Sequence, residues 1–153
     1  MYTQRLRSSL EYEVPSMTSK LRHIAISVPD PEAAATFFER AFGMTRAGKA
    51  MRGWYMTDGV FNVALLKFTG EPVPGFEDAG EHYGLIHFGM WVDDLDEAAK
   101  QIENAGGSYL TGRKEKDPNV YYEVKYKTPE GFVFDITESG WKGAVKNVVA
   151  SEA

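Results

Sequence analysis

An internal repeat constrains the fold of this chain more than any other feature of the sequence. When the sequence is aligned with itself at an offset of 64 residues, His23–Gly43 lies on His87–Gly107 without a gap. Eight of the 21 aligned pairs are identical, namely His23/His87, Val28/Val92, Asp30/Asp94, Ala34/Ala98, Ala35/Ala99, Glu39/Glu103, Ala41/Ala105 and Gly43/Gly107. Ala and Glu match easily by chance, but the chain has only three His, so a matched His is informative. We therefore expect two copies of one supersecondary unit.

Each copy predicts a strand followed by a helix that ends at a glycine. The apolar residues of His23–Val28 alternate with small or polar ones, which is the period of a strand with two different faces. Asp30 can cap the next helix, Pro31 suits its first position, and Gly43 can adopt the left-handed conformation that ends it. The second copy repeats this pattern from Asp94 to Gly107. The stripe of the first helix that we expect to face the sheet is Ala34, Phe37, Phe38 and Ala41.

Extended segments follow each expected helix and complete the units. They are Arg52–Met56 and Phe61–Phe68 in the first half, and Ser108–Gly112, Val120–Lys127 and Phe132–Thr137 in the second. The sequence thus predicts an α+β fold of two tandem βαβββ modules, residues 20–68 and 84–141, that form a cupped mixed sheet. We expect one domain over residues 19–142, with residues 69–83 as the linker between modules, since that segment is rich in Gly, Pro and acidic residues.

Composition excludes several classes of function. The net charge is −5 and there is no long basic run, so we expect neither a nucleic acid nor a membrane as partner. The chain contains no Cys, which excludes disulfides, thiolate metal sites and Cys nucleophiles. Residues 1–18 lack the apolar core of a secretory signal, so we expect a cytoplasmic protein with an N-terminal extension, in which Met17 is an alternative start to Met1. The tail, residues 143–153, is expected to fray or to pack on a partner subunit.

Strand parity brings three ligand-type side chains to one surface. If the apolar row of each first strand covers its helix, His23 and His87 point to the opposite, concave face of the sheet. In the last strand Phe132, Phe134 and Ile136 form the helix-side row, so Asp135 also faces the concave side. Two imidazoles and one carboxylate make the set that suits Fe(II) and leaves coordination positions open.

At this point the sequence resembles the vicinal oxygen chelate superfamily, which includes glyoxalases, methylmalonyl-CoA epimerases, extradiol ring-cleaving dioxygenases, and fosfomycin or bleomycin resistance proteins. The matching phrases are HIAISVPD, HFGMWVDD followed by a helix ending in AGG, and KTPEGFVFDI, and the resemblance covers roughly residues 20 to 141. It implies a glyoxalase-like fold, a small-molecule substrate that chelates a metal through two vicinal oxygens, and a homodimer. It also implies the metal ligands His23, His87 and a carboxylate four residues after Gly131, which is Asp135.

Two positions depart from the pattern of that family. The usual third ligand is Glu, whereas this chain has Asp135; Glu138 is a tempting replacement, but its parity places it on the helix side. Glyoxalases and epimerases also carry a fourth ligand, Glu or Gln, on the last strand of the first module, and the matching residue here is Ala64. Ala neither binds a metal nor acts as a base. A site with three ligands instead resembles that of the ring-cleaving dioxygenases.

Residues before the last turn are candidates for handling the substrate. If Tyr122, Val124 and Tyr126 face the helix, Glu123 and Lys125 line the cup, where they either hold a substrate carboxylate and move a proton or simply form a salt bridge. Tyr121, on the same face, joins them as a catalytic candidate. For Arg52, Trp54 and Met56, contact with solvent or with a second subunit is the favoured role. His82 has no repeat partner and is expected to be an exposed loop residue.

These expectations lead to a main hypothesis and two alternatives. The main one is a non-haem Fe(II) dioxygenase that cleaves the ring of a small hydroxylated aromatic compound, with Mn, Ni or Zn as other possible metals. The first alternative is a lyase, isomerase or epimerase of the glyoxalase type. The second is a non-enzymatic drug-binding protein, which is disfavoured because a simple binding pocket needs no metal ligands.

Overall fold

The computed structural model describes residues 18–70, 72–73, 75–77, 82–112 and 123–149. In chain order the first module contains β1 (Lys20–Ser27), α1 (Pro31–Phe42), β2 (Thr45–Ala50), β3 (Gly53–Thr57) and β4 (Asn62–Leu66). The second contains β5 (Gly84–Trp91), α2 (Leu95–Asn104), β6 (Ser108–Gly112), β7 (Val124–Lys127) and β8 (Val133–Thr137). The order βαβββ thus occurs twice, and the expected α+β class is confirmed.

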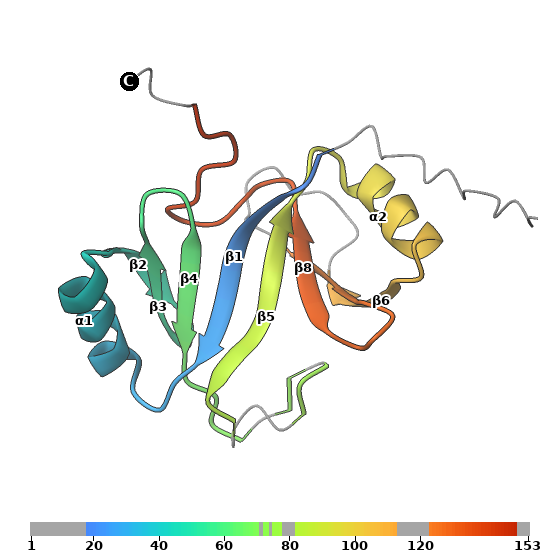
Figure 1. Ribbon diagram of the computed structural model, residues 1–153. Helices are drawn as coiled ribbons and strands as arrows, with labels where there is room; N and C mark the ends of the chain where they lie inside the picture. Colours follow the sequence, from blue (N-terminus) through green and yellow to red (C-terminus); the bar gives the residue numbers. More distant parts are fainter. Residues whose placement is uncertain (1–17, 71, 74, 78–81, 113–122, 150–153) are drawn as a thin grey trace, which may run out of the picture.

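The eight strands that the described residues form belong to one mixed sheet with the order β2-β3-β4-β1-β5-β8-β7-β6. At its centre β1 and β5 pair antiparallel and join the two modules, while β4 lies parallel to β1 and β8 parallel to β5. Figure 1 shows α1 and α2 toward opposite ends of this curved sheet, with β1 and β5 between them. Because β1 and β5 pair within one chain, the concave faces of the two modules adjoin each other without a second copy of the protein.

The helix ends largely follow the sequence. Asp30 accepts hydrogen bonds from the backbone of Glu32 and Ala33 and so caps α1, which ends at Gly43 with a left-handed φ of 66°. Asp94 caps α2 in the same way. The second helix, however, does not end at a left-handed Gly107: it stops at Asn104, and the glycine with positive φ is Gly106.

The two faces of the strands are as the alternation predicts, except that Phe132, expected in the helix-side row, precedes β8 and is 70% exposed. One apolar cluster beneath α1 includes Ile24, Ile26 and Val28, and another beneath α2 includes Phe88, Met90, Val92, Val124, Tyr126, Phe134 and Ile136. The residues that alternate with these apolar ones along each strand therefore lie on the opposite, concave face of the sheet. This parity decides which side chains can meet in the cup.

Several expectations about the first module are wrong. The chain forms a strand, β2, that the sequence does not reveal, because its segment TRAGKA has no apolar alternation. Met56 is fully buried, so it does not contact solvent as expected, whereas Trp54, which packs in the same cluster beneath α1, is half-buried. In α1 the sheet-facing residues are Ala34, Ala35 and Phe38, whereas Phe37 and Ala41 are exposed.

The segments outside the modules also make contacts. In the expected linker, Phe76 packs against a small cluster of Ala25, Ala64 and Ile86 on the concave side. The first part of the tail does not fray, because the guanidinium of Arg22 donates to the carbonyls of Val145 and Lys146 of the same chain. Within the described ranges, no helix has the length and apolar character that crossing a membrane requires.

Candidate metal centre

Three side chains from three adjacent strands converge in the concave face. His23 lies on β1, His87 on β5 and Asp135 on β8; His23 and Asp135 both pair with Gly89, and His87 lies two residues before Gly89 on the same strand. The Nε2 atoms of the two imidazoles are 3.2 Å apart, and Nε2 of His87 is 3.1 Å from Oδ2 of Asp135. One ligand-type atom from each of the three lies within 4.8 Å of the others. The structure thus brings together all three residues expected to bind a metal.

The geometry of this cluster fits a divalent cation. Two ligands about 2.1 Å from an ion and at right angles to each other are about 3.0 Å apart, close to both separations. Among the described residues, Oδ2 of Asp135 is the one buried side-chain oxygen or nitrogen that takes part in no well-oriented hydrogen bond. A buried, unsatisfied carboxylate oxygen is costly unless a cation or a donor reaches it. The donor set of two imidazoles and one carboxylate is also the set found in non-haem iron sites.

Asn62 orients the first imidazole. Its Nδ2 donates to the carbonyl of Lys142 at 2.8 Å, so its Oδ1 is left as an acceptor, 2.6 Å from Nδ1 of His23. Nδ1 of His23 must therefore carry the proton, and the lone pair of Nε2 faces the cluster. The sequence analysis did not identify Asn62, although its position two residues before Ala64 places it on the concave side of β4.

Trp141 forms a wall beside the same imidazole. Its ring stacks on His23 with centroids 4.8 Å apart and an interplanar angle of 8°, and its Nε1 donates to Glu123. The ring lies so close to the backbone of Gly89 that a Cβ there would be 2.6 Å from it. Trp141 follows the last strand and has no counterpart in the repeat, so no sequence signal assigned it to the site.

Burial and charge set the protonation of the cluster. Burial, together with the neighbouring His87, lowers the pKa of His23 to about 4, which keeps this imidazole neutral near pH 7. Burial acts to raise the pKa of Asp135, but the contact with His87 and the charge of Lys125 outweigh it, and the pKa lies below its ordinary value. Neutral imidazole and ionised carboxylate are the forms that bind metals.

The acid–base candidates lie at the edge of the cluster. Nζ of Lys125 is 2.6 Å from Oδ1 of Asp135 and 3.8 Å from Oε2 of Glu123. Burial and the charge of Asp135 raise the pKa of Glu123 to about 7. Lys125 and Glu123 therefore line the cup, as parity predicts, and form an ion pair as well. Tyr121, the third candidate, lies outside the described residues.

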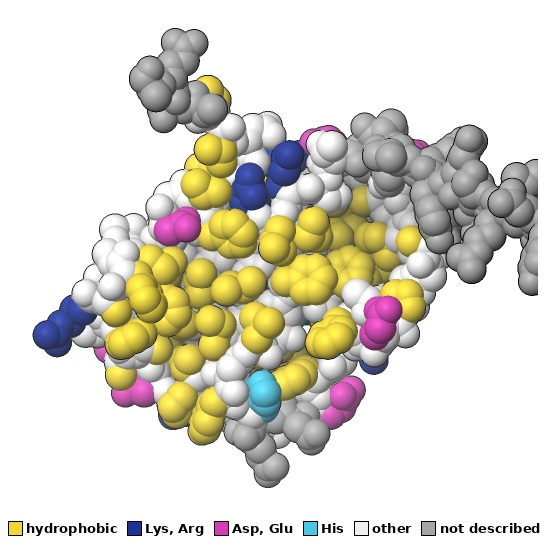
Figure 2. Space-filling model, viewed as in Figure 1, with side chains coloured by type: hydrophobic (Ala, Val, Ile, Leu, Met, Phe, Trp, Pro, Cys, Tyr) yellow, Lys and Arg dark blue, Asp and Glu magenta, His cyan; other side chains and the backbone are white. Residues whose placement is uncertain are grey.

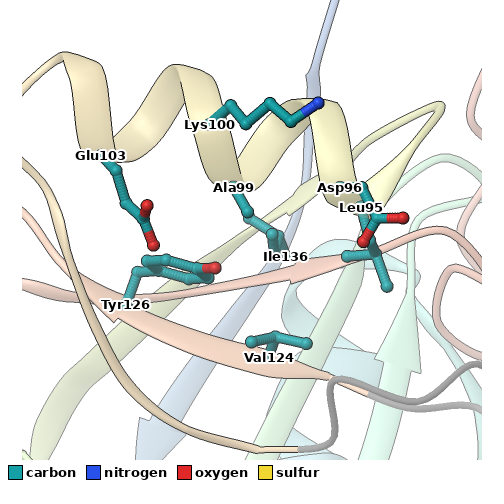
Figure 3. A pocket seen from close by; sticks show the side chains of 8 residues that line it. All are labelled: Leu95, Asp96, Ala99, Lys100, Glu103, Val124, Tyr126 and Ile136. Atoms are coloured by element: carbon teal, nitrogen blue, oxygen red, sulfur yellow. The ribbon is translucent and has the colours of Figure 1, made fainter.

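A cavity of about 390 Å³ opens beside these groups. Its lining residues are Lys49, Ala50, Met51, Tyr55, Gly112, Glu123, Lys125, Trp141 and Lys142. A second cavity, of about 410 Å³, lies on the other face of the sheet beneath α2 (Figure 3). Figure 3 shows Glu103 and Tyr126 on one side of it and Asp96 on the other, and none of the candidate site residues lines it.

The remaining candidates lie elsewhere. Ala64 is buried on the concave side, against Ala25 and Ile86, and contributes only a methyl group. Glu138 accepts a hydrogen bond from the backbone of Leu95 at the start of α2, so its carboxylate is on the helix side as parity predicts. His82 is exposed and contacts Phe76 edge-on.

Solved structures share this fold at low sequence identity. A Streptomyces coelicolor methylmalonyl-CoA epimerase, in complex with 2-nitronate-propionyl-CoA, aligns with a TM-score of 0.63 and 18% identity over 80% of this chain and 97% of the epimerase. The Mn(II)-bound glyoxalase from Novosphingobium aromaticivorans aligns with a TM-score of 0.59 and 18% identity, over 88% of this chain and 44% of that one. These similarities concern the fold alone.

A comparison with families of known proteins assigns the chain more firmly. No protein with a curated description matches the sequence. The model of the Glyoxalase/Bleomycin resistance protein/Dioxygenase superfamily, in contrast, matches residues 20–136, which span both modules and all three residues of the cluster. The chain therefore belongs to this superfamily.

Proposed function

We propose that this protein is a metal-dependent enzyme, and more specifically an Fe(II) dioxygenase that cleaves the ring of a small hydroxylated aromatic substrate. The observation that supports the proposal is the convergence of His23, His87 and Asp135 around a buried carboxylate oxygen with no well-oriented hydrogen bond. These three residues would hold the ion. Bound there, Fe(II) would supply sites for a chelating diol and for dioxygen.

The protein's own groups have separate tasks in this scheme. Lys125 holds Oδ1 of Asp135 and so leaves Oδ2 directed at the cluster. Asn62 fixes the tautomer of His23, and Trp141 fixes the plane of its ring. Glu123, at the wall of the cavity, accepts a proton from the substrate hydroxyl as the diol binds. Trp141 and Tyr55 flank the space where an aromatic ring would lie.

Ala64 favours the oxygenase over other reactions of the superfamily. Its position on β4 faces the cup, and its side chain is a methyl group that is 2% exposed. The side chain at this position therefore offers no carboxylate or amide group that could compete with an external ligand for the ion. We expect Ala64→Glu to reduce oxygenase activity by at least tenfold, because the added carboxylate occupies space and a coordination position.

One observation favours a second candidate, an isomerase or lyase that moves a proton next to a carbonyl. Such a reaction needs a base near the metal, and Ala64 provides none, but Glu123 lies in the same cup on the opposite module. Its pKa of about 7 is close to the optimum for accepting and returning a proton near neutral pH. A base therefore exists for this chemistry, although not at the position expected from the resemblance.

The charge of the cavity suggests the substrate class. Lys49, Lys125 and Lys142 line it, but Nζ of Lys125 contacts Asp135 and Nζ of Lys49 lies 4.0 Å from the ring centroid of Trp54, so we assign the positive charge that faces the cavity to Lys142. We infer that the substrate carries an anionic group such as a carboxylate. Lys142→Gln should weaken binding of 3,4-dihydroxybenzoate several-fold more than binding of catechol, whereas Lys100→Gln, on the far face, should change neither.

The decisive experiment is oxygen uptake after anaerobic purification and loading with Fe(II). We expect consumption of O₂ with a member of a panel of catechols, gentisates and dihydroxybenzoates, and no turnover of the hemithioacetal of methylglyoxal. Glyoxalase or epimerase turnover with Ni(II), Mn(II) or Zn(II), without oxygen uptake on any aromatic compound, would replace the first candidate with the second. Purified protein that binds no metal at all would instead support the drug-binding alternative.

A further inference from the structure

The helix-covered face of the sheet is largely apolar, and one part of it is hollow. Figure 2, viewed as in Figure 1, shows hydrophobic side chains across the middle of this face and charged groups toward its edges. The cavity of about 410 Å³ lies beneath α2, and its lining residues come from α2, β7 and β8 alone. This volume is within the range of about 300–1,000 Å³ that is typical of small-molecule sites. None of the residues assigned to the reaction lines the cavity, so its chemistry is its own.

The middle of the cavity is apolar apart from one hydroxyl group. It lies between Ala99 of the helix and Val124 and Ile136 of the sheet. Tyr126 is only 2% exposed, and its hydroxyl reaches the cavity without a hydrogen bond to any part of the chain that the structure describes. Figure 3 shows this hydroxyl on the side that faces Ala99 and Ile136. A phenol both donates and accepts hydrogen bonds, so this group is available to a ligand.

Two carboxylates of α2 flank the cavity at opposite ends. Figure 3 shows Glu103 above the ring of Tyr126 at one end and Asp96 at the other. The two residues are seven positions apart on α2, which separates them by about 10 Å along the helix axis. Lys100 also borders the cavity, but its Nζ is 3.0 Å from Oε1 of Glu97. Burial raises the pKa of Tyr126, and the charges of Glu103 and Asp96 raise it further. The cavity is therefore negative at both ends and holds a neutral phenol between them.

We propose that this cavity binds a linear organic dication, in which an apolar chain joins two ammonium groups, as in an aliphatic diamine. Each ammonium group pairs with one carboxylate, Asp96 or Glu103, and the chain lies against the apolar surface between them. The ammonium group beside Glu103 also donates to the hydroxyl of Tyr126. With C–C bonds of about 1.5 Å in a zigzag chain, about six to eight methylene groups span the two carboxylates. The site is independent of the reaction proposed above, because the metal cluster lies on the opposite face of the sheet.

Isothermal titration calorimetry of the full-length protein with 1,8-diaminooctane tests the proposal. We expect one site per chain, with binding at least tenfold weaker for 1,3-diaminopropane, which is too short, and for octylamine, which carries one charge. Asp96→Asn and Glu103→Gln should each weaken binding of 1,8-diaminooctane at least fivefold, and Tyr126→Phe about threefold. Glu130→Gln is the matched control, because it makes the same change of charge in an exposed turn outside the cavity and should bind as the wild type does.

Three results would overturn the proposal. The first is no heat of binding with 1,8-diaminooctane up to about 10 mM. The second is equal affinity for all three amines, which would mean attraction to the negative charge of the chain in general. The third is binding of 1,8-diaminooctane that both Asp96→Asn and Glu103→Gln leave unchanged, which would place the diamine elsewhere. Far-UV circular dichroism accompanies each variant, and Glu103→Gln keeps the shape of the side chain near the end of α2, so at least one variant is expected to fold.

Discussion

At the scale of single residues, strand parity separates two carboxylates that are three positions apart. Asp135 lies on the concave face within 3.1 Å of His87, while Glu138 accepts the hydrogen bond from the backbone of Leu95 on the other face. The sequence was sufficient to prefer Asp135, because the apolar residues Phe134 and Ile136 reveal which face is buried under the helix. It could not reveal Asn62 or Trp141, whose roles depend on contacts between segments far apart in the chain.

The two carboxylates provide a matched pair of variants. Asp135→Ala should lower metal affinity at least a hundredfold, because it removes a ligand, and should leave the helix start intact. Glu138→Ala should retain the metal but lose about 1 kcal/mol of folding stability, because a backbone N–H at the start of α2 loses its acceptor. Equilibrium dialysis with Fe(II) or Mn(II) and urea unfolding measure the two effects. The opposite pattern would mean that the register of β8 is shifted by one residue.

One buried group of the cup, His23, and one half-buried group, Glu123, act on acid stability in opposite directions. The folded pKa of His23 lies below its ordinary 6.5, so the unfolded state binds the proton first and stability falls as the pH decreases from 6.5 toward 4. The folded pKa of Glu123 lies above its ordinary 4.5, so the folded state binds the proton first and stability rises as the pH decreases from about 7 to 4.5.

Single substitutions separate these opposing contributions in metal-free protein. Relative to the wild type, His23→Gln should gain stability between about pH 7 and pH 5, because it lacks the group that penalises the folded state. Glu123→Gln should lose stability over the same interval. Urea unfolding at several pH values, after treatment with a chelator, gives both differences. Parallel pH profiles for the wild type and both variants would contradict the protonation states assigned here.

At the scale of elements, the repeat and its alternation predict most of what positions the cluster. β1, β5 and β8 carry apolar rows with a clear period, so their concave faces could be assigned from the sequence. β2 was missed because the edge strand Thr45–Ala50 contains Gly48 and charged residues and buries little. The face of α1 was misjudged because Phe37 and Ala41 are apolar but not covered within one chain. Apolarity alone does not distinguish a core stripe from an exposed one.

The close approach of β5 to Trp141 gives a prediction at this scale. In Gly89→Ala the new Cβ would meet the indole at 2.6 Å and Cβ of His23 at 2.9 Å, so the ring must move. We expect a loss of about 1–3 kcal/mol of stability and a red shift of tryptophan emission as the indole is displaced. Unfolding by urea and fluorescence spectra provide the readouts. Unchanged stability together with unchanged emission would show that the cup tolerates the added methyl and that Trp141 is not held there.

At the scale of the whole molecule, a single chain closes the cup and pairs the two modules through β1 and β5. The family assignment agrees with this architecture. The solved structures of an epimerase and a glyoxalase, each 18% identical in sequence to this chain, share the same architecture. The reaction is decided by side chains on that framework. In this chain these are a cluster with an Asp ligand candidate, an Ala at the position for which the resemblance implies a fourth ligand, and a Glu on the opposite wall.

The central claim is that His23 and His87 bind a metal ion, and metal content tests it most directly. The wild type, His23→Ala, His87→Ala and His82→Ala are loaded with Fe(II) under anaerobic conditions, dialysed, and analysed by elemental mass spectrometry. The account predicts about one ion per chain in the wild type and in His82→Ala, whose imidazole is exposed and distant from the cluster. It predicts almost none in His23→Ala and His87→Ala, with the fold retained by circular dichroism. One ion per chain in both of these variants would contradict the account.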